Sequence, residues 1–176
     1  MSLQPRTVIL AALSGVALVF ALAGPAFADH DNNGTDPDNR NQAIRKRGLT
    51  GPGDVAANHG KAQLERSVIT TSWGTNDVDV FDYTYGTTGW AGNTDCTDWN
   101  VLWTSCNVIR IRFNESSMSG ASQSKWQSLG CHEFGHSGDV GHRSPSSDSD
   151  NNSCMRSDIW PLTFDTHDIN AINASV

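Results

Sequence analysis

The feature that most constrains the fold is the stretch CHEFGHSGDVGH, residues 131–142. His132 and His136 are four residues apart, so on an α-helix they lie one turn apart on the same face and can reach one metal ion. His142 comes six residues after His136, too far along the chain to share that helix face. The spacing therefore predicts a helix that ends near Ser137 and a sharp turn that brings the third imidazole back.

These residue types are typical of a catalytic zinc site. Three protein nitrogens leave the fourth position of a tetrahedral zinc ion open for water, whereas structural zinc sites are closed. Zinc lowers the pKa of that water toward about 7 and polarises a substrate carbonyl. Glu133 can take the proton of the water and deliver it to the leaving amine. We expect His132, His136 and His142 as metal ligands and Glu133 as the catalytic base.

The pattern resembles that of the metzincin metallopeptidases, H-E-x-x-H-x-x-G-x-x-H, and the likeness covers residues 107–176. Family members have a methionine in a tight turn beneath the metal, and Met155 is the one methionine after the histidines. The ending LTFDTHDINAIN looks like the closing helix of matrixin-like members. A cysteine before the first histidine and another before the methionine look like the small secreted bacterial type. The resemblance implies a zinc endopeptidase with an α+β, zincin-like single domain: a small twisted sheet, an active-site helix, and a C-terminal irregular part plus helix.

Other zinc peptidases fit less well. Thermolysin-like enzymes use a downstream Glu as the third ligand, but Glu133 is the last Glu of the chain. Astacin-like and serralysin-like enzymes place a Tyr after the methionine turn, and the last Tyr here is Tyr85. Snapalysin-like members carry Asp as the third ligand, so His142 favours the matrixin-like type. The resemblance also puts Trp160-Pro161 at a wall of the primary substrate pocket, although simple packing is an equal alternative.

One residue departs from the family pattern: Asp139 occupies the position of the motif glycine. That glycine serves a turn with positive φ, where Gly is least strained. Asp tolerates this conformation better than most residues. We expect the turn to be made by Gly138 or by a left-handed Asp139. A third alternative, Asp139 as a zinc ligand, ranks below His142 because Asp139 lies where the helix is ending.

The beginning of the chain reads as an export signal. Residues 1–28 combine Arg6, a long apolar run and the small-x-small sequence Ala26-Phe27-Ala28, which is typical of a secretory signal peptide. Residues 29–66 hold many turn formers and few apolar residues, so we expect a flexible lead-in or a pro-segment. The metallopeptidase domain is expected over residues 67–176.

Within that domain the sequence predicts a few regular elements. Asn107–Asn114 alternates apolar and charged residues, which predicts a strand with one buried face. Weaker strands are expected at residues 68–73 and from Val78 onward, with an irregular excursion over residues 86–106. Residues 122–137 predict the active-site helix, and residues 164–176 predict a helix capped at Asp165 or Thr166.

Four cysteines in a chain that carries an export signal predict disulfides. Cys96, Cys106, Cys131 and Cys154 allow three pairings. We favour Cys96 with Cys106 and Cys131 with Cys154, because the first pair closes a short loop. Each bridge would stabilise the fold by about 2–4 kcal/mol.

The net charge of the chain limits the kinds of partner that it is expected to bind. The chain has 19 acidic and 12 basic residues, a formal net charge of −7, whereas nucleic acid and anionic membranes require a basic face. We expect a protein or peptide substrate, no nucleic acid, no membrane after signal removal, a monomer, and an extracellular location. Calcium is a weakly supported second metal. Asp148, Asp150 and Asn152 alternate but lack the glycine and glutamate of an EF-hand loop.

Three further histidines, His30, His59 and His167, are expected to be surface or capping residues rather than ligands. Two other functions remain open on the sequence alone. One is a secreted zinc-binding module without catalysis, and the other is a disulfide-stapled binding protein without metal. The presence of Glu133, which would have no task in a zinc-binding module, favours the enzyme over that module, and a metal analysis would decide against the binding protein.

Overall fold

The computed structural model describes residues 30–32, 34–75, 77–143 and 152–176. Within these ranges the chain forms a small α+β domain with a mixed five-stranded sheet and three helices. The sheet has the strand order β3-β2-β4-β6-β5, with the bounds β2 Asn41–Lys46, β3 Thr70–Trp73, β4 Val78–Tyr83, β5 Gly92–Trp99 and β6 Cys106–Asn114. The first four are parallel to one another, and β5 is the antiparallel edge strand.

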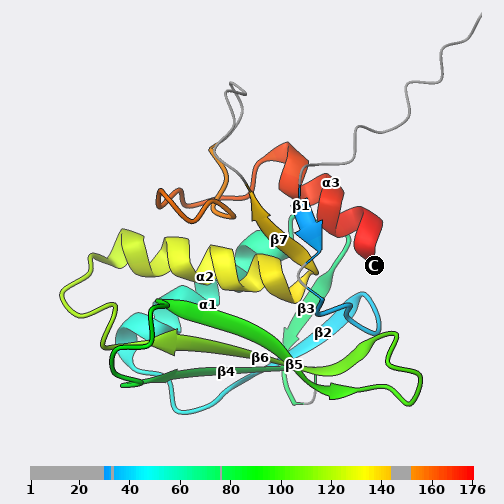
Figure 1. Cartoon of the computed structure of the whole chain (residues 1–176), viewed down its shortest axis with the longest axis horizontal. Helices are drawn as coiled ribbons and strands as arrows, with labels where there is room; N and C mark the ends of the chain where they lie inside the picture. The colour runs from blue at the N-terminus through cyan, green and yellow to red at the C-terminus, as the bar shows by residue number, and fades with distance from the viewer. Residues whose placement is uncertain (1–29, 33, 76, 144–151) are drawn as a thin grey trace, which may run out of the picture.

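Three helices and a second, small sheet complete the domain. The helices are α1 Gly51–Leu64, α2 Gln123–Ser137 and α3 Thr166–Ser175, and the small sheet pairs β1 His30–Asn32 with β7 Val140–Arg143. Figure 1 shows α1 and α2 on one face of the large sheet, with β7 and α3 on the far side of α2. Helix α2 therefore lies at the centre of the molecule and contacts both parts.

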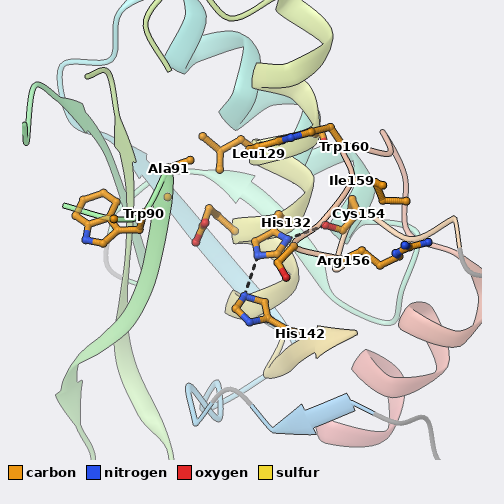
Figure 2. A pocket seen from close by; sticks show the side chains of 14 residues that line it. Trp90, Ala91, Leu129, His132, His142, Cys154, Arg156, Ile159 and Trp160 are labelled. Atoms are coloured by element: carbon orange, nitrogen blue, oxygen red, sulfur yellow. Dashed lines mark hydrogen bonds between the residues drawn. The ribbon is translucent and has the colours of Figure 1, made fainter. Parts of the chain in front are cut away.

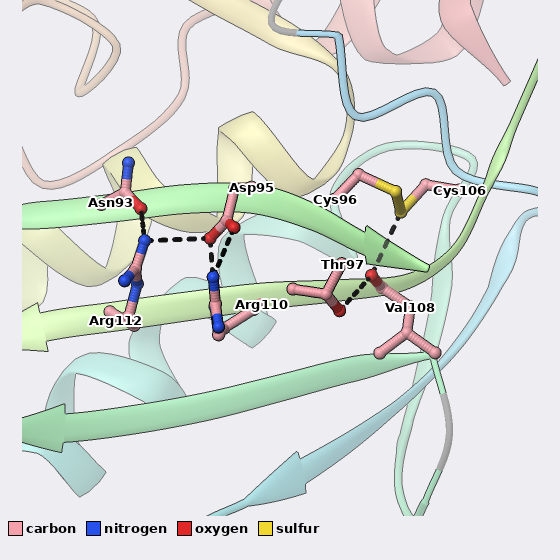
Figure 3. A network of polar contacts seen from close by, with 8 residues as sticks. All are labelled: Asn93, Asp95, Cys96, Thr97, Cys106, Val108, Arg110 and Arg112. Carbon is pink, nitrogen blue, oxygen red and sulfur yellow. Dashed lines mark hydrogen bonds and ion pairs between the residues drawn. A yellow bond between two sulfur atoms is a disulfide. The ribbon is translucent and has the colours of Figure 1, made fainter. Parts of the chain in front are cut away.

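Apolar and charged residues alternate along β6, which gives the sheet one buried face and one solvent-facing face. Ile109, Ile111 and Phe113 are at most 1 % exposed and face the helices. On the opposite face Arg110 and Arg112 form ion pairs with Asp95 of β5, as Figure 3 shows. The predicted strand at residues 107–114 is thus confirmed. The predicted irregular excursion over residues 86–106 is partly wrong, because residues 92–99 form β5 and pair with β6.

The structure also corrects the predicted domain boundary at residue 67. Strand β2 lies between β3 and β4 inside the sheet, and α1 packs along α2. Residues 41–64 are therefore integral to the fold rather than a flexible lead-in or a removable pro-segment. Helix α1 is capped at its N-terminus by Thr50, whose hydroxyl accepts a hydrogen bond from the Gly53 amide. Sequence patterns miss this helix because its buried positions are mostly small residues instead of large apolar ones.

Two glycines allow α1 and α2 to approach closely. A Cβ on Gly130 of α2 would lie 2.0 Å from the Ala56 carbonyl oxygen. A Cβ on Gly60 of α1 would lie 2.4 Å from the Gly130 carbonyl oxygen. Because these atoms belong to the backbone, a side chain at either position forces the helices apart.

Replacing Gly130 by alanine is expected to destabilise the protein. Overpacking at a site closed by backbone costs about 3 kcal/mol, and the better helix propensity of Ala returns only about 1 kcal/mol. The net loss in the free energy of unfolding is thus about 2 kcal/mol, measurable by urea denaturation. Gly51→Ala is the matched control, because a Cβ there meets nothing within 4 Å. Equal stability of the Gly130→Ala variant and the parent would contradict the close packing.

The cysteines pair as favoured from the sequence. Cys96 joins Cys106 and Cys131 joins Cys154, with Cα–Cα distances of 5.8 and 6.0 Å. The first bridge closes the hairpin between β5 and β6, and the second ties α2 to the segment that carries Met155. Helix α3 also agrees with prediction, since it is capped at Asp165 with Asp168 completing a capping box.

Some predictions fall outside the described residues. The signal peptide over residues 1–28 and the loop that contains Asp148 and Asp150 belong to this group. Across the part of the chain that the structure describes, no helix combines the length and apolarity needed to cross a bilayer.

Candidate metal centre

Three imidazole side chains, two from α2 and one from β7, lie close together. His132 and His136 lie one turn apart on α2, and His142 lies on β7. The Nε2 atom of His132 is 3.1 Å from the Nε2 atoms of both His136 and His142. Their ligand atoms form a group that could hold a metal ion. The structure thus brings together the three histidines that the spacing singled out.

Backbone carbonyls fix the orientation of the two helical histidines. The Nδ1 atom of His132 lies 2.7 Å from the Cys154 carbonyl oxygen, and the Nδ1 atom of His136 lies 2.7 Å from the Val140 carbonyl oxygen. A carbonyl only accepts, so each Nδ1 carries the proton and each neutral Nε2 keeps a lone pair. Two such lone pairs 3.1 Å apart repel each other, whereas a cation between them would be coordinated. The donor set therefore fits a metal ion.

The protonation state of His132 also suits a ligand. Its pKa is lowered from the ordinary 6.5 to about 4, mainly by burial; the hydrogen bond to the Cys154 carbonyl opposes this shift, and the nearby His142 adds to it. At neutral pH the ring is therefore uncharged. A neutral imidazole is the form that binds metals.

The turn before His142 is made by Asp139. Gly138 caps α2 at φ −95°, and Asp139 has φ +65°. Of the two alternatives for this turn, the structure therefore selects the left-handed Asp139. Its carboxylate Oδ1 accepts the amides of Thr35 and Asp36 at 3.0 and 3.2 Å. Asp139 is not part of the group of potential ligands.

The segment before β2 thus stabilises the turn that carries the third histidine. The Thr35 hydroxyl donates to the His136 carbonyl oxygen at 2.5 Å. Together with the bonds to Asp139, this contact joins residues 34–36 to the end of α2. The strain of a non-glycine residue at positive φ is offset by two hydrogen bonds that a glycine could not accept. Residues 34–36 therefore stabilise the turn even though Asp139 stands where the metzincin pattern has glycine.

Met155 lies directly beneath the helix that carries the two histidines. A Cβ on Gly135 of α2 would be 2.1 Å from the Met155 sulfur, so the absence of a side chain at Gly135 makes room for it. Met155 is fully buried, and its carbonyl accepts the amide of Arg143 in β7. This position is the one that the resemblance to metzincins implies for the methionine turn. The role of Met155 as that turn stays a prediction.

The side chain of Glu133, on α2, contacts the edge strand β5. Its carboxylate Oε2 accepts the Thr94 hydroxyl at 2.6 Å, and a Cβ on Gly92 would lie 2.2 Å from Oε1. Burial raises the pKa of Glu133 to about 8, although the Thr94 hydrogen bond opposes the shift. Thr94 and Gly92 were not predicted, because no local sequence pattern identifies a residue that contacts Glu133 from a distant part of the chain.

A cavity of about 340 Å³ opens beside these residues. Figure 2 shows it between the segment before β5 and the segment after Cys154. Its apolar lining includes Trp90, Leu129, Ile159 and Trp160, and His132, Glu133 and His142 line it as well. Of the predicted wall, Trp160 lines the cavity, whereas the carbonyl of Pro161 accepts the Ser128 hydroxyl.

A second group of potential ligands, rich in acidic residues, is poorly suited to a metal ion. Asp165, His167 and Asp168 lie close enough to hold an ion. However, Arg143 forms an ion pair with Asp165, and this positive charge disfavours a cation there. Among the other histidines, His59 contacts the Leu162 carbonyl oxygen at 2.5 Å and is not a member of the group formed by His132, His136 and His142. Asn152, from the weakly supported calcium loop, is exposed.

The metal-free protein is expected to lose stability between pH 6.5 and 8. In that interval an unfolded Glu is ionised, whereas buried Glu133, with its pKa of about 8, keeps its proton. The folded state then binds more protons, so stability falls as pH rises. At about 1.4 kcal/mol per pH unit the loss approaches 2 kcal/mol. Below pH 6.5 His132 takes up a proton in the unfolded state but not in the folded state, because its folded pKa is about 4. The contribution of His132 to stability therefore rises with pH in that range.

Urea unfolding of chelator-treated protein at pH 6.5 and 8 measures this loss, and the Glu133→Gln variant should lose the slope. A parent that is equally stable at both values, or a variant with the same slope, would show that Glu133 is not buried in its acid form.

No family model matches the chain, and neither a curated protein nor a solved structure matches it. The function must therefore be inferred from the site itself.

Proposed function

We propose that the protein is a secreted zinc endopeptidase of the metzincin, matrixin-like type, with Glu133 as its general base. The observation that carries the proposal is the convergence of three Nε2 atoms beside a buried glutamate. Two nitrogens each about 2.0–2.1 Å from one tetrahedral zinc are about 3.4 Å apart, and the structure has 3.1 Å for both pairs that include His132. Three nitrogen ligands also fit the catalytic rather than the structural type of zinc site.

The chemistry follows from the residues around the three histidines. Bound zinc would supply a Lewis acid that polarises the scissile carbonyl and acidifies water. Glu133 would accept a proton on its carboxylate and pass it to the leaving nitrogen. Burial raises the pKa of Glu133 to about 8 in the metal-free protein, and the positive charge of bound zinc would lower it, which would leave a carboxylate able to accept a proton. Thr94 would hold the carboxylate in place during both transfers.

An extended peptide is the substrate that the surroundings favour. Strand β5 is the edge of the sheet and begins at Gly92, next to Glu133. Within the described residues its outer edge has no strand partner and offers backbone donors and acceptors to a peptide that adds as a further strand. The adjoining cavity, lined by Trp90, Leu129 and Trp160, would take an apolar side chain next to the scissile bond. The two disulfides fit an extracellular protein, and we attribute export to the signal peptide predicted over residues 1–28.

The proposal is tested with the mature protein, zinc and a mixed peptide library analysed by mass spectrometry. We expect cleavage within peptides, loss of cleavage with a chelator, and recovery with zinc. Zinc bound in a one-to-one ratio without cleavage of any peptide would favour the zinc-binding module instead. Absence of bound metal would eliminate both functions.

Thr94→Val is expected to lower kcat about ten- to a hundredfold with little change in KM. Valine keeps the shape of threonine but cannot donate to Glu133, and a hydrogen bond to a charged group contributes about 1.5–3 kcal/mol. Thr94→Ser keeps the hydroxyl and should retain most of the activity. Steady-state kinetics on one cleaved peptide compare the three proteins. Equal loss in both variants would indicate a packing role for Thr94 rather than a positioning role.

A further inference from the structure

The hairpin between β5 and β6 exposes three consecutive large apolar residues. Val101, Leu102 and Trp103 are 95, 78 and 75 % exposed. We name residues 101–103 the apolar tip. Figure 1 shows this hairpin projecting beyond the end of the sheet, at the right of the view. Single exposed apolar residues are common on protein surfaces, but three in sequence at the end of a projection are not.

Hydrogen bonds centred on Asn100 hold the tip in one shape. The Asn100 amide donates to the Ser105 carbonyl oxygen, and its own carbonyl accepts the Trp103 amide. Its side-chain oxygen accepts the Thr104 amide at 2.9 Å, and its side-chain nitrogen donates to the Thr104 and Ser105 hydroxyls. The loop is therefore bonded internally while its apolar side chains point outward.

Trp103 is held in a conformation that bulky residues seldom adopt. Its φ is +56°, and residues in this region persist only where the surroundings enforce them. Its ring stacks on Trp99 with 6.3 Å between the ring centroids. The Cys96–Cys106 disulfide closes the base of the hairpin, as Figure 3 shows. A partner would thus meet a preformed tip and would incur little cost for ordering it.

The charges around the tip indicate which kind of surface it fits. Residues 97–107 include one charged side chain, Asp98, and no lysine or arginine. An anionic membrane attracts basic residues, so it is not the expected partner. Trp beside aliphatic residues, flanked by the hydroxyls and amides of Thr, Ser and Asn, is instead the composition suited to the interface between water and neutral lipid.

The small size of the tip argues against a protein partner. Stable protein interfaces bury about 1,200–2,000 Å², far more than three side chains on a convex loop provide. A lipid surface needs no matching shape and accepts an apolar projection of this size. We propose that the apolar tip inserts into the interfacial region of electrically neutral membranes and docks the protein there. The expectation of no membrane partner was based on charge alone. The apolar tip has no charged residue, so that argument does not apply to it.

Docking by the tip would leave the candidate metal centre in water. Strand β5 runs from Gly92, beside Glu133, to Trp99 at the base of the tip. Eight residues of extended strand cover about 25 Å. The cavity and the three histidines would therefore remain clear of the lipid. The proposal does not depend on the enzymatic function.

Co-sedimentation of the mature, zinc-supplemented protein with phosphatidylcholine vesicles tests the proposal. We expect binding that high salt does not weaken and that added phosphatidylglycerol does not strengthen. A variant with Val101→Ser, Leu102→Ser and Trp103→Asn should partition at least about tenfold less, since each buried apolar side chain contributes a large share of the transfer free energy. Asn tolerates the positive φ at residue 103. Tyr83→Ser, which alters a side chain 66 % exposed at the opposite end of the sheet, should bind as the parent does.

Several results would overturn the proposal. They are no binding to neutral vesicles, equal binding by the parent and the triple variant, and binding that requires phosphatidylglycerol and vanishes in high salt. A parent that is dimeric by analytical ultracentrifugation, becomes monomeric in the triple variant and ignores vesicles would assign the tip to a second copy instead. The single variant Leu102→Ser, with near-ultraviolet circular dichroism equal to that of the parent, separates lost binding from misfolding and should also bind less.

Discussion

Glutamine in place of Glu133 is expected to lower kcat/KM for peptide hydrolysis by about 10²–10⁴, the contribution typical of a positioned general base. The amide has the size of the carboxyl group and can still accept the Thr94 hydroxyl, so the contact between α2 and β5 should persist. What the amide cannot do is accept a proton. Because Glu133 is not among the potential metal ligands, the variant should hold as much zinc as the parent. Initial rates on one cleaved peptide, together with metal content by mass spectrometry, measure both quantities.

Glu115→Gln is the matched control for this experiment. Glu115 accepts a hydrogen bond from Thr84 at the surface and lies outside the site, so its variant should cleave at the parental rate. A Glu133→Gln variant that is as active as the parent would remove Glu133 from the mechanism. A variant that has lost its zinc would instead point to a structural role for the carboxyl group.

The second large effect concerns metal affinity. His142→Ala is expected to weaken zinc binding by more than a hundredfold. Structural sites with four ligands bind zinc with about 10–16 kcal/mol, which amounts to about 3 kcal/mol for each ligand. His142 is exposed on β7, so its truncation should leave the metal-free fold intact. Competition with a fluorescent chelator gives the dissociation constants of parent and variant.

Thermal unfolding provides an independent measure of the same interaction. A ligand present at a thousand times its dissociation constant stabilises the folded state by about 4 kcal/mol, so saturating zinc should raise the Tm of the parent and have much less effect on His142→Ala. His59→Gln serves as control, because His59 contacts the Leu162 carbonyl oxygen and is not one of the grouped histidines. Equal zinc affinity in His142→Ala and the parent would exclude His142 as a ligand.

The centre of the site could be predicted from the sequence because its signals are local. The four-residue spacing of His132 and His136 needs only a helix to bring the rings together, and α2 supplies it. The alternation in β6 and the cap at Asp165 are equally local. His142 required one further assumption, that the chain turns, and the left-handed Asp139 makes that turn.

The parts that could not be predicted depend on contacts between distant segments. Helix α1 buries Ala56, Ala57 and Gly60, and small residues leave no periodic pattern of large apolar ones. Strand β5 is an edge strand whose pairing with β6 includes ion pairs to Asp95, so it lacks a hydrophobic signature. Thr94 meets Glu133 across 39 residues of sequence. Such partners become visible only when the fold places them together.

The zinc site is tested most directly by an anomalous diffraction measurement at the zinc absorption edge on crystals of the zinc-loaded protein. We expect one strong peak about 2.0–2.1 Å from the Nε2 atoms of His132, His136 and His142, with a fourth ligand that is not from the protein. A peak at Asp165, His167 and Asp168, or a zinc ion that His142 does not contact, would contradict it.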